Sequence, residues 1–331
     1  MSDVVILDVA HGNCALVRST GAHCVIDAPT GALLLNTLED LGVSCVEVAF
    51  ISHADKDHIA GIIGLLSSKT IKLKRLFLNP DSQKQTKIWR HLLAAVKVAE
   101  RHGSCEVITS LTTTMPGQVS IGEVSVHVEA PSASFALAGS GSKDAKGRSI
   151  TSNSISAVLR LKFGDRPSVL LTGDLDEIGL DDAIEHDSDL SAETMVFPHH
   201  GGLPNSSDTS AFVNKIMDAV APGMVIFSNG REMHNNPRSE VLQPVLKMGC
   251  GIACTQLAKR CHKTPLFGDA HLEVHRAQGQ LSGASCGGSM TIELANSARR
   301  IVSAHNAHQA FIDENVAAPM CRASRQTRDG T

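Results

Sequence analysis

The stretch Val46-Glu47-Val48-Ala49-Phe50-Ile51-Ser52-His53-Ala54-Asp55-Lys56-Asp57-His58 decides the fold. Its first half is a mainly apolar run, which is typical of a β-strand buried on both faces. Its second half places two histidines and two aspartates within six residues, directly after that strand. A loop at the carboxyl end of a strand is where α/β folds tend to place their chemistry. The stretch therefore predicts an α/β protein with a functional site at this strand end.

The side chains of this cluster favour a metal site. Imidazole and carboxylate groups so close together would repel or desolvate one another without a cation between them. The set suits zinc, manganese or iron(II), and no thiolate is present in the cluster. A solvated polar turn is the alternative, but turns rarely bring such a set together right after an apolar strand. We therefore predict that the metal ligands include His53, Asp55, Asp57 and His58.

The composition fits a folded protein without strong global charge. The 331 residues are enough for one large domain, or one domain with a small appendage, and 42 % of them are hydrophobic. The net charge of −4 gives no general attraction to nucleic acid or to an anionic membrane, although bound metal would neutralise phosphate locally. Nine Phe, one Trp and no Tyr argue against a base-stacking platform.

The sequence gives few indications of the cellular compartment. No run approaches the ~18 apolar residues of a membrane span, and Met1-Ser2-Asp3 does not begin a secretory signal. The nine cysteines are scattered, which fits reduced thiols better than a disulfide framework. We expect a cytoplasmic protein without a membrane partner.

Hydrophobic patterns predict strands and helices in mixed order. Strands are expected at 4–9, 14–17, 24–27, 46–51, 73–78, 105–109, 123–129, 155–163, 168–172, 194–197 and 224–228. Helices are expected at 31–41, 59–67, 83–102, 208–219, 238–248 and 297–316, and a mobile loop at 132–150. Such a mixture favours one or two sheets sandwiched by helices. The pattern changes after Gly251, so we expect a hydrolase domain at 1–250 and a C-terminal extension at 251–331.

The cluster resembles the H-x-H-x-D-H signature of the metallo-β-lactamase superfamily, with Asp55 at the position of the second histidine. This H-x-D-x-D-H variant is typical of the hydrolase domain of ComEC-type DNA-uptake competence proteins. Five further segments resemble the same relatives in the same order, namely Asp8 to Ala15, Asn153 to Leu161, Leu171 to Asp176, Phe197 to Gly202 and Asn236 to Leu242. The resemblance covers residues 3–248 and implies an α/β, αββα sandwich of two mixed β-sheets flanked by helices.

The same resemblance implies two divalent metal ions, zinc or manganese, that activate water. His53 and Asp55 would hold one ion, and Asp57 and His58 the other. Asp174 would bridge both, because a carboxylate reaches two ions ~3.5–4 Å apart. The pair His199 and His200 would supply an imidazole to the second ion, one as a ligand and the other as a substrate contact.

Catalytic and substrate-binding residues are expected around these ions. Asp57 or Asp174 would orient the attacking water, and His234 would donate a proton to the leaving group. His11 is expected in the loop that approaches the metals, either behind a ligand or as a simple loop histidine. The expected substrate contacts are Lys56, Asn153, Ser154 and Asn236.

A phosphodiesterase or nuclease is the leading functional hypothesis, with nucleic acid or another phosphodiester as substrate. The basic segment 69–75, with Lys84, Lys87 and Arg90 nearby, would either line a groove for a phosphate backbone or form a solvated face. A hydrolase of small phosphoesters, lactones or thioesters is the first alternative. A metal-stabilised regulatory or binding protein without turnover is the second.

The C-terminal cysteines carry a weaker signal. Cys254, Cys261, His262 and Cys286 would suit a structural zinc site, but no C-x2-C spacing is present. Ordinary buried thiols are therefore the preferred interpretation at the sequence level.

Overall fold

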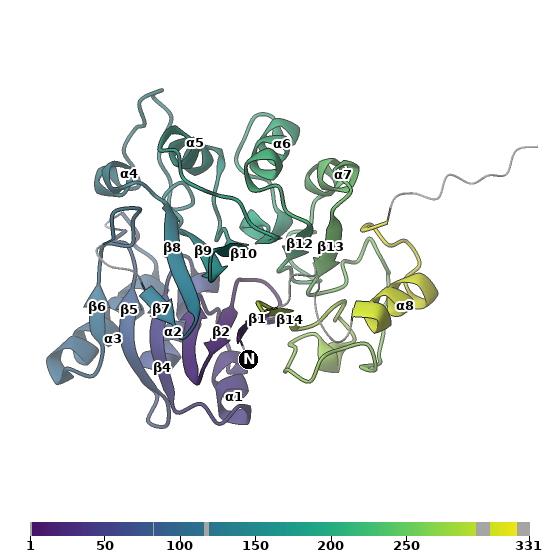
Figure 1. Cartoon of the computed structure of the whole chain (residues 1–331), viewed down its shortest axis with the longest axis horizontal. Helices are drawn as coiled ribbons and strands as arrows, with labels where there is room; N and C mark the ends of the chain where they lie inside the picture. Colours follow the sequence, from purple (N-terminus) through teal and green to yellow (C-terminus); the bar gives the residue numbers. More distant parts are fainter. Residues whose placement is uncertain (1, 82, 116–118, 296–304, 323–331) are drawn as a thin grey trace, which may run out of the picture.

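The N-terminal strand β1 (Ser2–Ile6) is buried on both faces. Val4 and Ile6 lie in a core between two sheets, while Val5 lies in a second core on the opposite face, because successive side chains on a strand point in opposite directions. A strand that is apolar on both faces requires a covering layer on each side. The computed structural model describes residues 2–81, 83–115, 119–295 and 305–322, and it has these layers (Figure 1).

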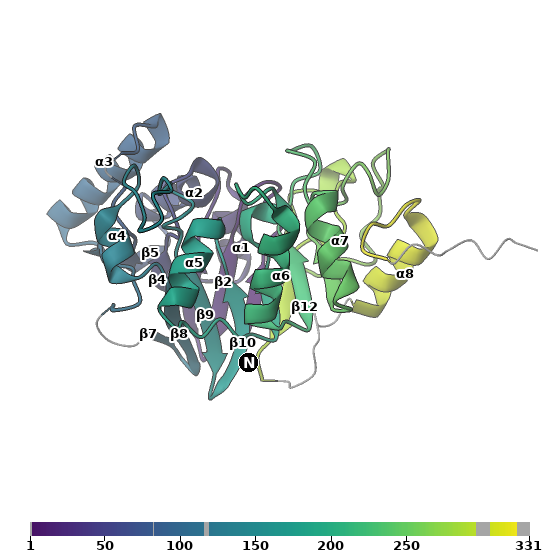
Figure 2. The ribbon, with the colours of Figure 1, turned by 90° about the horizontal axis from the view of Figure 1, so that it is seen from above.

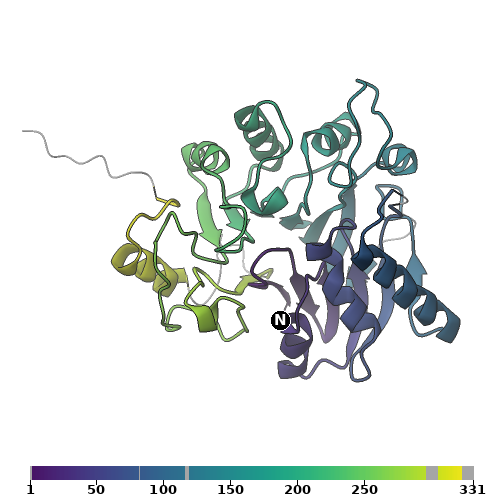
Figure 3. The same ribbon diagram turned by 180° about the vertical axis from the view of Figure 1, so that it is seen from behind.

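The first sheet has seven strands in the order β14-β1-β2-β3-β4-β5-β6. After β1, they are β2 (Ala15–Ser19), β3 (Ala22–Ile26), β4 (Cys45–Phe50), β5 (Lys72–Phe77), β6 (Glu106–Ile108) and β14 (Met290–Glu293). Strands β3 to β6 run parallel, and the other neighbours pair antiparallel. Its outer face is covered by α1 (Leu33–Asp40), α2 (Lys56–Leu66) and α3 (Lys87–His102) (Figure 3).

The second sheet also has seven strands, in the order β13-β12-β11-β10-β9-β8-β7. They are β7 (Val119–Ile121), β8 (Val124–Ala130), β9 (Val158–Phe163), β10 (Arg166–Leu171), β11 (Thr194–Val196), β12 (Met224–Phe227) and β13 (Gly251–Cys254). Strands β10 to β13 run parallel. Its outer face is covered by α5 (Glu177–Glu185), α6 (Thr209–Val220) and α7 (Ser239–Lys247), with α4 (Ala133–Ala138) beside α5 (Figure 2).

The predicted sandwich of two mixed sheets flanked by helices is confirmed. The expected elements up to residue 250 have counterparts, but the sequence patterns missed α5, β7 and β14. Helix α4 lies inside the expected mobile loop 132–150, and it begins where Ser132 accepts a hydrogen bond from the backbone of Phe135. Of the predicted helix 297–316, residues 305–315 form α8 (His305–Asn315), and 297–304 lie outside the described residues.

The two sheets take edge strands from beyond the predicted boundary at residue 250. Strand β13 pairs with β12 in the second sheet, and β14 pairs with β1 in the first. The sandwich therefore includes part of the C-terminal extension, and the division at residue 250 stays a prediction.

Parallel strands from both sheets end at one edge of the sandwich. Strands β3 and β4 of the first sheet end at Ile26 and Phe50, and β10 and β11 of the second end at Leu171 and Val196. The loops that follow carry the polar residues singled out in the sequence. No helix within the described ranges has both the length and the apolarity needed to cross a membrane.

Candidate metal centre

Asp174 lies at the middle of a cluster of histidines and aspartates. Its Oδ2 atom is 3.6 Å from Nε2 of His53 and 3.0 Å from Nδ1 of His199. Its Oδ1 atom is 3.3 Å from Nε2 of His58 and 3.4 Å from Nε2 of His200. Each oxygen of one carboxylate thus faces its own pair of imidazoles, which is the arrangement expected of a carboxylate between two cations.

The Oδ1 side forms the tighter group. Among the described residues, one set of His, Cys, Asp and Glu ligand atoms lies entirely within 4.8 Å of one another, and it consists of Asp57, His58, Asp174 and His200. Oδ2 of Asp57 is 3.3 Å from Nε2 of His200 and 3.9 Å from Nε2 of His58. Two imidazoles and two carboxylates at this spacing are a ligand set for zinc or manganese.

The residues that face Oδ2 of Asp174 form a less compact group of ligand atoms. Oδ2 of Asp55 lies 3.8 Å from Nε2 of His53, while its Oδ1 atom forms an ion pair with Lys84. Asp55 is about one-third exposed, and Nδ2 of Asn153 stands 3.5 Å from Nδ1 of His199. This side therefore offers fewer free carboxylate oxygens to a cation than the Asp57 side.

Buried atoms without hydrogen-bond partners show that the cluster fits a cation. Nε2 of His53, His58 and His200 and Oδ1 of Asp174 are all buried and unpaired in the described structure. A buried polar atom left unpaired costs about 1–3 kcal/mol. Nε2 of His58, Nε2 of His200 and Oδ1 of Asp174 face one another, so a metal ion between them would satisfy all three atoms, while Nε2 of His53 faces the other oxygen of Asp174.

The charges of the cluster favour the same conclusion. Burial lowers the pKa of His53 to about 4, with repulsion from His58 adding to the effect, so its ring is neutral and can donate a lone pair near neutral pH. Burial opposes ionisation of Asp174, but the surrounding imidazoles, His200 first, hold its pKa well below the usual range. Burial would also lower the pKa of His58, yet Asp27 and Asp174 outweigh it and raise that pKa. The site is one that attracts positive charge.

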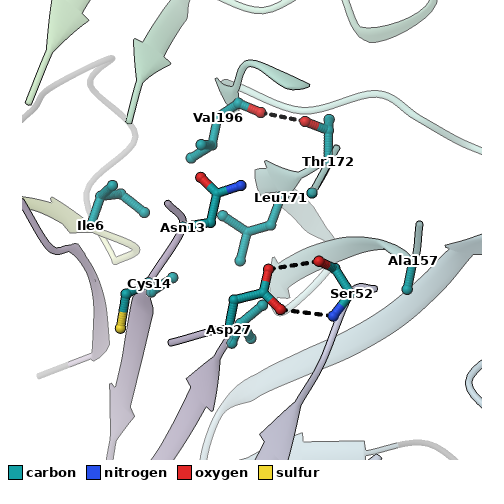
Figure 4. A pocket seen from close by; sticks show the side chains of 12 residues that line it. Ile6, Asn13, Cys14, Asp27, Ser52, Ala157, Leu171, Thr172 and Val196 are labelled. Carbon is teal, nitrogen blue, oxygen red and sulfur yellow. Dashed lines mark hydrogen bonds between the residues drawn. The ribbon is translucent and has the colours of Figure 1, made fainter. Parts of the chain in front are cut away.

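A second layer of residues orients the His58 ring. Nδ1 of His58 is 2.8 Å from Oδ2 of Asp27, so Nε2 points at the cluster. Asp27 also accepts hydrogen bonds from the backbone and the hydroxyl of Ser52, each at 2.7 Å, above a small cavity between the sheets (Figure 4). On the other side of the cluster, Nδ1 of His200 is 3.0 Å from the carbonyl oxygen of Ser228. Such partners fix ring orientation and tautomer in metal sites.

Unusual backbone angles bring the ligands together. His199 and His200 both have left-handed angles, with φ of 54° and 56°, and their rings reach opposite oxygens of Asp174. Gly173 has φ of 53°, and a Cβ atom there would lie 2.4 Å from Oγ of Ser156. Left-handed backbone is costly for side-chain-bearing residues and persists where the surrounding structure imposes it, commonly at functional sites.

The predicted metal ligands are all brought together around Asp174. We expected one imidazole of the pair His199 and His200 at the second ion and the other as a substrate contact, and the two rings lie on opposite sides of Asp174. Their consecutive left-handed residues turn the two rings apart, and this could not be read from a His-His pair in the sequence.

The four predicted substrate contacts differ in their exposure and in whether they reach the cluster. Lys56 is exposed at the start of α2. The Asn236 side chain is buried, with Nδ2 at 3.4 Å from the carbonyl of His199 and Oδ1 unpaired. Asn153 contacts the His199 ring. The prediction for Ser154 is wrong in geometry, because its hydroxyl is buried and donates to Asp176 at 2.7 Å, away from the cluster.

Two further histidines extend the cluster towards solvent. Nε2 of His11 is 3.3 Å from Oδ2 of Asp57, and its ring centroid is 4.5 Å from that of His200. The exposed His234 ring lies with its centroid 4.9 Å from that of His11, and the two rings are tilted by 52°. Burial lowers the pKa of His11 to about 4, with His200 adding to the effect. His11 therefore contacts a predicted ligand directly, while His234 stands one ring farther out.

The basic segment divides into parts that lie far from each other. Lys72 starts β5 opposite Cys45, and the strand runs roughly 16 Å to Phe77, whose end faces the cluster. The start of the segment therefore lies at the end of β5 away from the cluster, and the two interpretations of residues 69–75, a groove for a phosphate backbone or a solvated face, stay predictions. Lys84, in the loop after β5, is the part of this segment that reaches the cluster.

Sequence reasoning missed the roles of Asp27 and Lys84. Asp27 follows β3 as His53 follows β4, so its place after a parallel strand was a usable signal. Lys84 carries no comparable signal, because the course of the loop between β5 and α3 brings it to Asp55.

Comparisons with known proteins find solved structures of low similarity. No family model and no curated protein matches this sequence. Similar solved structures include the metallo-β-lactamase fold protein YhfI from Bacillus subtilis, at 12 % identity and TM-score 0.45, over 77 % of this chain and 96 % of that one. Igni18, a metallo hydrolase from the archaeon Ignicoccus hospitalis, matches at 12 % identity and TM-score 0.42, over 76 % and 94 %. Tm1679, a metal-dependent hydrolase of the β-lactamase superfamily, matches at 14 % and 0.43, over 76 % and 94 %. Values this low leave the activity open.

Proposed function

We propose that this protein is a hydrolase that cleaves phosphodiester bonds with two divalent cations held by the cluster around Asp174. The observation that carries the proposal is the division of the Asp174 carboxylate between His53 and His199 on one side and His58 and His200 on the other. The order of motifs along the chain, which resembles the ComEC-type hydrolase domain, supports DNA or a related phosphodiester as the substrate.

The residues divide into two ligand sets that share Asp174. One set would be His53, Asp55, His199 and Asp174, and the other Asp57, His58, His200 and Asp174. Two cations bound there would make water acidic enough to ionise near neutral pH and would offset charge on a phosphate. Imidazole and carboxylate ligands suit zinc and manganese, and these are the two ions that we propose.

Several residues of the chain then act on substrate and water. Asp57 and Asp174 are ionised at neutral pH and accept a hydrogen bond from the attacking water, which orients it. The exposed His234 ring lies at the rim and supplies a proton to the leaving oxygen. His11 lies between them and packs against both His200 and His234.

The charges at the rim favour an anionic substrate. Lys84 lies beside Asp55 and donates to Ser152 at 3.2 Å, and Lys56 is exposed next to the same aspartate in sequence. We propose that both ammonium groups contact phosphate oxygens that enter the cluster. With few aromatic side chains, the contacts would be to the phosphate backbone rather than to bases.

A substrate panel tests the proposal. The full chain, reconstituted with Mn²⁺ or Zn²⁺, is assayed on bis-p-nitrophenyl phosphate, linear DNA and an acyl ester, with Asp174→Ala as the control for contaminating activity. We expect turnover of the two phosphodiesters by the wild type alone. Turnover of the acyl ester alone would reassign the protein to small-ester hydrolysis. Bound metal without turnover of any substrate would favour the regulatory alternative.

A further inference from the structure

Four cysteines from separate segments of the C-terminal part line one cavity. Cys254 ends β13, Cys261 follows in a turn, Cys286 lies before β14, and Cys321 follows α8. The cavity has a volume of about 20 Å³, which is room for one water molecule or one metal ion. The chain has nine cysteines, and four of them line this one small cavity.

The donors around this cavity are those of a structural zinc site. Sγ of Cys286 is 3.4 Å from Nε2 of His308 on α8. This separation is that of a hydrogen bond from the imidazole to the sulphur, and such a partner supports a thiolate that binds a metal. Among the described residues, no three ligand atoms at this cavity lie within 4.8 Å of one another, so the thiols would have to move together to share one ion. No disulfide links them.

The thiols lie close enough for their charges to interact. Burial raises the pKa of Cys254, and Cys286, Cys321 and Cys261 raise it further. Three arginines act in the opposite direction and favour thiolates: Arg260 and Arg231 at Cys261, and Arg322 at Cys321. This positive rim would offset the net negative charge of a zinc ion with four thiolate ligands.

The C-terminal segment also needs a cross-link to hold its shape. Between Thr255 and Ser289 the regular structure is one short 3₁₀ helix (Gln280–Ser282). The buried apolar cluster here consists of Leu257, Cys286, Ile312 and Val316. A core this small stabilises little by burial alone, and small loop-rich units are commonly held by disulfides or metals.

We propose that Cys254, Cys261, Cys286 and Cys321 bind a structural zinc ion, and that His308 donates a hydrogen bond to the Cys286 thiolate. The ligand set differs from the sequence-based candidate site in one residue, because Cys321 replaces His262. Nδ1 of His262 accepts a hydrogen bond from the backbone of Ala317, so this ring is directed at the end of α8. Cys321 would be the fourth zinc ligand, and the ion would link the residues after α8 to Cys254 at the end of β13.

The zinc ion would also support the loop that carries His234. The guanidinium of Arg231 donates to the carbonyls of Leu257, His262 and Lys263. That of Arg260 donates to the carbonyls of Asn235 and Pro237. The segment bearing Cys261 thus holds the backbone on both sides of Asn236, which contacts His199.

Zinc X-ray absorption on the full chain tests the proposal. The Asp174→Ala variant serves as the sample, because it removes the bridging ligand of the other centre, whose ligands are nitrogen and oxygen. We expect about one zinc ion per chain with sulphur neighbours near 2.3 Å. Adding Cys286→Ser should remove that ion, while adding Cys250→Ser, a cysteine outside the cavity, should leave it in place.

Two further measurements keep the test decisive if the Cys286 variant fails to fold. Wild-type protein loaded with Co²⁺ should show thiolate-to-cobalt charge-transfer absorption, and its four cavity thiols should resist alkylation until a chelator is added. Four outcomes would each overturn the assignment. Two are spectroscopic: zinc without sulphur neighbours, or a nitrogen in place of one sulphur. The other two are chemical: rapid alkylation of all four thiols before chelation, or a disulfide among them.

Discussion

Oδ2 of Asp27 lies 2.8 Å from Nδ1 of His58, and both side chains are buried. The Asp27 carboxylate lies at Nδ1 and leaves Nε2 directed at Oδ1 of Asp174, 3.3 Å away. The orientation of a predicted ligand therefore depends on a residue 31 positions away in the chain.

Replacing Asp27 with asparagine should weaken metal binding without emptying the site. Loss of such a partner typically costs 10–100-fold in metal affinity or activity. We expect a fall of this size in the affinity for the cation on the Asp57 side, measured by competition with a chromophoric chelator. Asp3→Asn is the matched control, because Asp3 is equally buried but pairs with Arg18. Unchanged affinity in the Asp27 variant would contradict the role.

Asp174→Ala should abolish phosphodiester turnover and lose metal on both sides, because each oxygen of this carboxylate faces a separate pair of imidazoles. The measurement is elemental analysis beside kcat, which we expect to fall at least ~10³-fold. Asp176→Asn is the control, since Asp176 caps α5 and the amide oxygen of asparagine can also cap a helix. A fully active Asp174 variant would remove the central ligand from the proposal.

Lys84→Ala should impair phosphodiesters selectively. A charge-assisted hydrogen bond to phosphate contributes about 1.5–3 kcal/mol, so kcat/KM for bis-p-nitrophenyl phosphate should fall roughly 10–100-fold. Metal content should not fall, because removing the ammonium frees Asp55. Lys87→Ala, at the start of α3, is the control. An equal loss on a neutral ester substrate would argue against a phosphate contact.

His234→Ala should lower kcat and leave metal content intact. Its ring contacts His11 rather than Asp57 or Asp174, so it lies outside the ligand sets. General acid catalysis contributes typically 10²–10⁴-fold, and a substrate with a better leaving group should recover most of the lost rate. If the variant loses metal, or if the leaving group makes no difference, His234 is not the proton donor.

Asp181 should stabilise the fold in a pH-dependent way. Burial raises its pKa, but hydrogen bonds from Lys215, Arg148 and Lys146 outweigh burial and hold the pKa below 3.8. A depressed folded-state pKa gives stability that is present above the unfolded value and is lost as the pH falls through the folded one. Asp181→Asn should therefore lower the free energy of unfolding by about 1 kcal/mol at pH 7.

Denaturant titrations from pH 8 down to pH 3.5 measure this effect. The gap between wild type and Asp181→Asn should be constant down to about pH 5 and should narrow below pH 4. Asp218→Asn, an exposed carboxylate on α6, should show a much smaller gap throughout. A gap that widened on acidification would contradict the assigned pKa shift.

The sequence by itself determined most of the strands and helices up to residue 250 and the position of the main cluster. Val46 to Ile51 is apolar enough to be recognised as a buried strand, and His53 to His58 follow it directly. These are local patterns, because the period of a strand and the spacing of ligands within six residues are set by neighbouring positions.

The tertiary structure decided which distant side chains complete each site. Two sheets whose parallel strands end at one edge bring Asp27, Asp174 and His200 to His58, and the loop after β5 brings Lys84 to Asp55. At the other end of the chain, α8 and the residues after it bring Cys321 to Cys286. Contacts between residues far apart in sequence depend on how whole strands and helices pack, and no short stretch of the chain encodes that packing.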